Sequence, residues 1–327
     1  MSEYSLMDFS EVPDLVSQVT RLNTAAFAEY EGALLMGDEF TRWYLQRPGS
    51  SSQLCVGALA GEQLVSMVLV TVQPVQVGGR LLSCGIVDSV GTDPAHRRQG
   101  LARKLMEMAH ERMQAAGADA ALLYTNPEGL AYHFYNRMDY QTRAQCVLFE
   151  GKRPAKRGSL AVRLARTDDH DAIIRMLDSF YADYEGYAPL RGELWDWHKV
   201  NRPAEMPLQL LVAEAGDRLV ATCSLGTVRL LLDSDTVAVT AMSDFAWLVD
   251  ACDGQEALSA LLAEAAQENL VCLLDETDQI AGLCEAVGLE KAIGEVSMLL
   301  PFTPQAHDAM LDKSGPWYVM AESVIGV

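Results

Sequence analysis

Two successive halves of the chain predict the same order of secondary structure, and this repetition restricts the fold more than any other feature. Each half reads as a strand, two helices, three strands, a helix, a strand, a helix and a last strand. The predicted strands are 4–9, 54–60, 64–72, 81–90, 120–125 and 145–149, then 160–164, 208–214, 219–232, 237–249, 270–274 and 295–300. The predicted helices are 15–27, 38–46, 101–116 and 127–138, then 168–181, 191–200, 255–268 and 279–287. A period of about 155 residues indicates an internal duplication.

The length of 327 residues also favours two domains, since one domain typically has about 150 residues. Residues 152–159 are basic, contain Pro and Gly and have no apolar periodicity, which is typical of a linker. We therefore expect domains at 1–153 and 160–327, joined by a linker at 154–159.

The net charge of −20 lies mainly in residues 154–327, and it argues against binding to nucleic acid or to an anionic membrane. The N-terminus lacks the basic start and apolar core of a signal peptide, and no stretch approaches the ~20 apolar residues of a membrane span. The seven cysteines form no C-x-x-C pair, which favours reduced thiols in a cytoplasmic protein. No pair of His or Cys residues has the spacing of a structural zinc site, so we expect no metal. The oligomeric state stays open.

The loop at 90–102 is the most informative segment, because it stands between a predicted strand and a long predicted helix. A helix N-terminus offers unpaired N–H groups and the positive end of the helix dipole. Gly100 allows an anion to approach the backbone closely. Arg97, Arg98, Arg103 and Lys104 add positive charge at that point of an otherwise acidic chain. The pattern therefore predicts a pyrophosphate-binding site.

Residues 97–102, Arg-Arg-Gln-Gly-Leu-Ala, resemble the GNAT superfamily signature Arg/Gln-x-x-Gly-x-Gly/Ala. The resemblance implies an α/β (α+β) fold: two tandem GNAT-like domains, each a mixed, mostly antiparallel sheet flanked by helices with a splayed parallel strand pair. It implies acetyl-CoA as co-substrate, with its pantetheine arm on the backbone of Val90 and Thr92. The residues expected around the pyrophosphate are Arg97, Arg98, Gln99, Gly100, Leu101, Ala102 and Arg103.

Residues 126–140 resemble the GNAT segment that follows this helix, Asn…Ala-x-x-Phe-Tyr-x-x-x-Gly-Phe. The resemblance implies that Asn126 contacts CoA and that Tyr135 lies beside the thioester sulfur. A phenol has a pKa of about 10, so it can protonate a departing thiolate at neutral pH. The alternative interpretation is that Tyr135 is a core residue. Asp139 replaces the usual Gly, and Asp tolerates the left-handed backbone conformation better than most residues.

Three further side chains are candidates for proton transfer. Asp88, in the strand before the loop, is the candidate general base, with an ion-pair role as the alternative. His133 and His110 qualify by residue type alone, and ordinary surface or core positions are the favoured interpretation for both.

The sequence of the second half lacks both the basic loop and an equivalent of Tyr135. Its corresponding loop, 250–256, carries three carboxylates in place of the basic residues, and Cys284 stands where Tyr135 would be. Carboxylates repel a pyrophosphate, so we expect a degenerate domain. The tandem order and His96-Arg97-Arg98 are similar to the enhanced-intracellular-survival acetyltransferases, without their third domain.

The sequence thus predicts an N-acetyltransferase that moves an acetyl group from acetyl-CoA to a primary amine. Two alternatives are an acyl-CoA sensor without turnover and a GNAT enzyme that transfers another acyl group. The sequence does not identify the acceptor. The acidic second half favours a cationic small molecule or peptide, because its charge would attract such a molecule by electrostatic steering. Phe40, Trp43 and Tyr44 on the predicted helix 38–46, together with Tyr30, could line an acceptor cleft or belong to the core.

Overall fold

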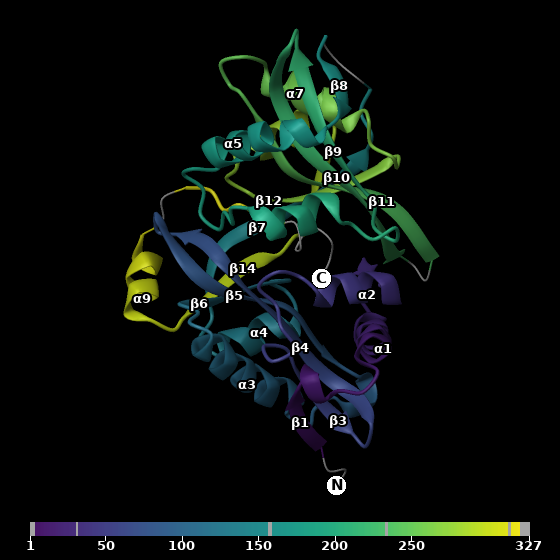
Figure 1. Ribbon diagram of the computed structural model, residues 1–327, viewed down its shortest axis with the longest axis vertical. Coiled ribbons are helices and arrows are strands. Elements are labelled where there is room, and N and C mark those ends of the chain that lie inside the picture. The colour runs from purple at the N-terminus through teal and green to yellow at the C-terminus, as the bar shows by residue number, and fades with distance from the viewer. Residues whose placement is uncertain (1–3, 31, 156–158, 233–234, 313–314, 321–327) are drawn as a thin grey trace.

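The computed structural model describes residues 4–30, 32–155, 159–232, 235–312 and 315–320 (Figure 1). The first half contains β1 (Tyr4–Asp8), α1 (Leu15–Phe27), β2 (Ala33–Leu34), α2 (Asp38–Leu45), β3 (Val56–Ala60), β4 (Gln63–Val77), β5 (Arg80–Thr92), α3 (Leu101–Ala115), β6 (Ala120–Thr125), α4 (Leu130–Asn136) and β7 (Gln141–Lys152). The second contains β8 (Ala161–Leu164), α5 (His170–Phe180), α6 (Gly192–Trp195), the π-helical turn η4 (Asp196–Val200), β9 (Leu208–Ala215), β10 (Arg218–Leu232), β11 (Asp235–Trp247), α7 (Gly254–Leu262), β12 (Asn269–Asp275), α8 (Gln279–Ala286), β13 (Glu290–Ala292), β14 (Val296–Pro301) and α9 (Pro304–Leu311). The mixed α/β class and the repeated element order are confirmed.

The two halves exchange their last strands. Strand β14 of the second half pairs with β6 and β7 of the first, and β7 pairs with β12 of the second. The strand order is therefore β1-β3-β4-β5-β6-β14-β7-β12-β11-β10-β9-β8. Figure 1 shows β14, in yellow, beside the blue and teal strands of the first half. One hydrogen-bonded sheet thus runs through both halves.

A splayed parallel strand pair occurs in each half, as predicted. Strands β5 and β6 pair only where Cys84–Ile86 meets Ala120–Leu122. Strands β11 and β12 pair only at Thr240 and Ala241. In both halves the register then shifts against the preceding strand. Because a β-bulge bends its strand and increases the twist, it turns β5 away from β6.

Helices cover both faces of the first half of the sheet. Helices α1 and α2 bury Val19, Leu22 and Phe40 against one face, and α3 buries Leu105 and Met106 against the other. The α1–α2 core also includes Trp197 of the second half, so the halves share a hydrophobic cluster. Of the helices in the described ranges, none combines the length and apolarity needed to cross a bilayer.

Several predicted boundaries were wrong for local reasons. Helix α4 starts at Leu130 rather than at residue 127, because the side chain of Asn126 accepts the Glu128 N–H and closes a turn. Helix α7 ends at Leu262, and residues 196–200 form a π-helical turn rather than α-helix. The sequence patterns also missed β2, β13 and α9. Residues 156–158 of the predicted linker lie outside the described residues, and the domain limits stay a prediction.

The strand exchange predicts how the first half behaves alone. A fragment of residues 1–153 lacks β12, β13 and β14, so β6 keeps one unpaired edge and β7 loses all the strand partners that it has among the described residues. We expect this fragment to aggregate or to melt without a cooperative transition, as followed by size-exclusion chromatography and circular dichroism. Residues 154–327 supplied in the same refolding mixture should restore a folded complex. A monomeric 1–153 fragment with a cooperative melt would contradict this expectation.

Candidate functional site

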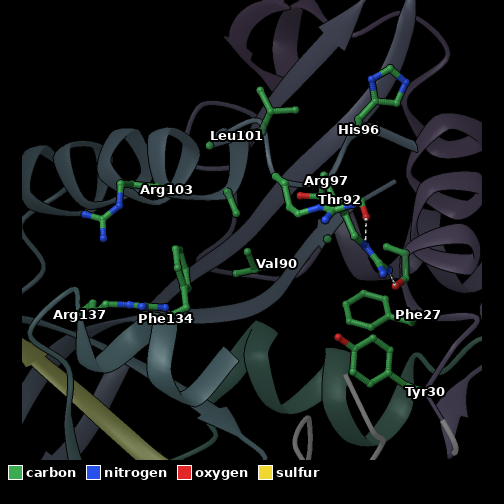
Figure 2. A pocket seen from close by; sticks show the side chains of 15 residues that line it. Phe27, Tyr30, Val90, Thr92, His96, Arg97, Leu101, Arg103, Phe134 and Arg137 are labelled. Carbon is green, nitrogen blue, oxygen red and sulfur yellow. Dashed lines mark hydrogen bonds between the residues drawn. The ribbon is translucent and has the colours of Figure 1, made fainter. Parts of the chain in front are cut away.

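A cavity of about 590 Å³ lies at the N-terminus of α3. Its walls come from α1, the end of β5, the loop before α3, α3 itself and α4 (Figure 2). The lining residues are Ala26, Phe27, Tyr30, Val90, Gly91, Thr92, His96, Arg97, Arg98, Gly100, Leu101, Ala102, Arg103, Phe134 and Arg137. Eight of the predicted cofactor-binding residues are among them; Gln99 and Asn126 are not.

The N-terminus of α3 opens onto this cavity without a side-chain cap. Gly100, the N-cap residue, has φ of 74°, and no side chain accepts a hydrogen bond from the first turn of the helix within the described structure. Arg98 is also left-handed, with φ of 63°. Left-handed residues in such a turn direct backbone N–H groups into a concave surface that suits an anion. A Cβ atom at Gly100 would meet no atom within 4 Å, so the space beside it is open.

The basic side chains that line the cavity differ in their partners and positions. Arg97 is committed to the protein, since it bonds the Glu29 carboxylate at 2.6 Å and the Ala26 carbonyl at 2.9 Å. Arg103 and Arg137 also line the cavity, on the side away from Arg97 in Figure 2. Arg137, at the end of α4, was missed from the sequence; its position two residues after Tyr135 was the available signal. The cavity therefore combines an uncapped helix with positive charge from two helices.

The cavity lining also has apolar parts and includes the strand edge predicted to hold pantetheine. Phe27, Tyr30 and Phe134 contribute aromatic rings. Val90 and Thr92 lie beyond Ile86, where the parallel pairing with β6 ends. A strand edge released from its neighbour can pair with an extended ligand.

Tyr135 is buried on α4, with its ring packed edge-on against Tyr140 at 5.7 Å between centroids. Burial raises the pKa of its phenol well above the ordinary value, and the neighbouring Tyr30 phenol adds to this shift. The group is therefore protonated at neutral pH. Tyr135 does not itself line the cavity, although Phe134 and Arg137 on the same helix do. Asp139 has φ of 66°, which confirms the expected left-handed turn after α4.

Asp88 lies at the bulge of β5, in the sheet interior. Its carboxylate is 3.5 Å from the Arg47 guanidinium and accepts a bond from Thr71 at 3.4 Å. Both side chains of the ion pair are nearly inaccessible, at 0% and 3% exposure. The ion-pair role that the sequence left open is thus present, and the role as base stays a prediction.

The other candidate side chains have ordinary positions. His110 bonds the Tyr140 hydroxyl at 2.8 Å, and burial lowers its pKa to about 4, so it is neutral at pH 7. His133 is exposed and outside the cavity lining. Phe40 and Tyr44 are core residues, whereas Tyr30 is 58% exposed and lines the cavity.

The corresponding helix of the second half is closed to anions. Asp253 caps α7 by accepting the Glu256 N–H at 2.9 Å, which fills the helix N-terminus with the protein's own carboxylate. Gly254 is buried, and a Cβ atom there would lie 2.8 Å from the Trp247 ring. Cys284 is fully buried on α8. Features that favour an anion therefore occur at α3 and not at α7.

Comparison with known proteins agrees with this geometry. Residues 13–143 match the family model of the acetyltransferase (GNAT) domain. The fold is shared with N-myristoyltransferase of Saccharomyces cerevisiae with bound myristoyl-CoA, at a TM-score of 0.74 and 13% identity over 92% of this chain and 83% of that one. It is also shared with a GCN5-related N-acetyltransferase from Anabaena variabilis, at a TM-score of 0.64 and 13% identity over 91% and 72%. The search of curated proteins found no match. The family match and the shared fold support the relation to the GNAT superfamily that the 97–102 motif indicated.

Proposed function

We propose that the chain transfers an acyl group, acetyl first among the candidates, from its CoA thioester to a primary amine. The observation that carries this proposal is the uncapped, glycine-started helix α3 facing a cavity beside a released strand edge. The GNAT match of residues 13–143 supports it, and so does the myristoyl-CoA bound by the structurally similar yeast enzyme.

The residues around the cavity suit the parts of such a substrate. The N–H groups of residues 99–103 would hold the pyrophosphate, and Arg98, Arg103 and Arg137 would balance its charge. Val90 and Thr92 would pair with the amides of the pantetheine arm. Arg97 would act indirectly, since its side chain fixes the loop to α1 through Glu29.

The chemistry needs one proton donor and one acceptor. The amine nitrogen attacks the thioester carbonyl, the C–N bond forms, and the C–S bond breaks to release a thiolate. Tyr135 stays the predicted donor to this thiolate: its phenol is protonated at neutral pH, although its raised pKa makes it a weaker acid than an exposed phenol. The amine also loses a proton, for which Asp88 stays the predicted base.

Two narrower assignments remain proposals. The acidic second half favours a cationic acceptor such as a polyamine, an aminoglycoside or lysine. The second assignment is a tandem domain arrangement like that of the enhanced-intracellular-survival acetyltransferases, which rests on the sequence similarity to them. An acyl-CoA sensor is the alternative, and it needs the cavity but no turnover.

Gly100→Glu tests the pyrophosphate site. Acetyl-CoA at about 100 times its Kd should stabilise the wild type by about 2.7 kcal/mol, seen as a rise in Tm. Gly100→Glu should lose this rise, because the side chain enters the open space and adds a negative charge. Gly117→Glu is the matched control: Gly117 follows the other end of α3, also has positive φ and also has open space. A folded Gly100→Glu protein that still gains the full rise would remove the site from α3.

The contrast between α3 and α7 predicts one acetyl-CoA per chain. Isothermal titration of the full chain should give a stoichiometry near one, since Asp253 closes the second helix N-terminus. Two equivalent sites per chain would be incompatible with this assignment.

Tyr135→Phe tests the proton donor and separates enzyme from sensor. The change keeps the ring and its packing and removes only the hydroxyl. With an amine found by screening for thiol release, kcat should fall about 10²-fold while acetyl-CoA affinity stays constant. Tyr140→Phe is the control, since it removes a phenol from the same cluster and loses the His110 bond, worth about 1 kcal/mol of stability. Equal kcat values for the wild type and Tyr135→Phe would exclude Tyr135 as the acid.

A further inference from the structure

Helix α2 of the first half is held at both ends by residues of the second half. At its N-terminus, where α2 has no side-chain cap of its own, the Glu205 carboxylate accepts N–H bonds from Gly37 at 3.0 Å and Phe40 at 3.3 Å. Near its C-terminus, the Trp197 ring stacks on Trp43 with 3.8 Å between centroids and 3° between planes. The Trp197 indole N–H also donates to the Trp43 carbonyl at 3.0 Å.

Trp197 also contacts Arg47, the residue that pairs with Asp88 at the bulge of β5. Arg47, two residues after α2, lies over the Trp197 ring at 5.2 Å. Its guanidinium also donates to Gln73 at 3.0 Å and pairs with Asp88 at 3.5 Å. A continuous series of contacts therefore runs from η4 of the second half to the point where β5 leaves β6.

The second half repeats this ion pair without an anion site. At the register shift between β10 and β11, Asp244 pairs with Lys199 of η4, which also donates to Ser224 at 3.0 Å. Burial alone would raise the pKa of Asp244, but the attraction of Lys199 and its hydrogen bonds bring the pKa below the ordinary value. Both pairs thus lie at a register shift, and the second lies in the half whose helix α7 is closed to anions, which favours a structural role at the bulge.

We propose that Trp197 is a positioning residue for the acyl-CoA edge of the first half: it holds Arg47 beside Asp88, and so fixes the bulge that directs Val90 and Thr92 into the cavity. This inference rests on the proposed function. It gives the second half a role in cofactor affinity, although Trp197 does not line the cavity. An interaction that acts through a two-state element typically changes affinity by about 5- to 150-fold.

The test is isothermal titration of acetyl-CoA into the full chain and its variants. Trp197→Leu removes the flat contact with Arg47 and should weaken acetyl-CoA binding about tenfold. Trp197→Phe keeps a ring against Arg47 and should stay within about twofold of the wild type. Trp195→Leu is the matched control: Trp195 is equally buried, but its indole bonds His170 within the second half. It should lower the Tm and leave the affinity unchanged.

A second variant covers the case in which Trp197→Leu does not fold. Arg47→Lys keeps the charge beside Asp88, and lysine already stands at the equivalent position of the second half, so this variant should fold. It loses the planar contact with Trp197 and should weaken acetyl-CoA binding about fivefold. Wild-type affinity in folded Trp197→Leu or in Arg47→Lys would overturn the positioning role alone. A wild type that binds no acetyl-CoA would overturn the proposed function and this inference with it.

Discussion

The backbone hydrogen bonds of β14 set the architecture on which everything else depends. Buried strands must satisfy their N–H and C=O groups, and among the described residues β14 is the partner of β6 on that edge. By filling the position between β6 and β7, β14 joins two sheets that would otherwise end in the molecular interior. This join fixes the second half against the first, so that Glu205 and Trp197 contact the two ends of α2.

Two helices with equivalent places in the fold differ in what they offer to a ligand. Helix α3 starts at a glycine and leaves its first N–H groups facing a cavity, whereas α7 starts at Asp253 and satisfies them internally. The difference lies in a few side chains, not in the backbone architecture. This is a physical example of a backbone arrangement kept in both halves while the uncapped helix N-terminus occurs at α3 and not at α7.

The parts of the site that follow local rules could be predicted from the sequence. Loop 97–102, its helix and the left-handed Asp139 depend on neighbours within a few residues. What the sequence missed depends on distant partners. The bond of Arg97 to Glu29 spans 68 positions, and the exchange of β14 joins residues far apart in the chain. Periodicity reports which face of a strand is buried, but not which strand lies beside it.

The strand exchange also has a consequence for biosynthesis. Strand β6 ends at Thr125, and its partner strand begins at Val296. At roughly 5–20 residues per second, the ribosome needs on the order of 10–35 seconds to make the roughly 170 residues between them. During this interval the candidate site can have its loop and α3 but not a completed sheet. The first half must therefore wait for almost the whole chain before its own fold can close, and the nascent protein is exposed to misassociation for that period.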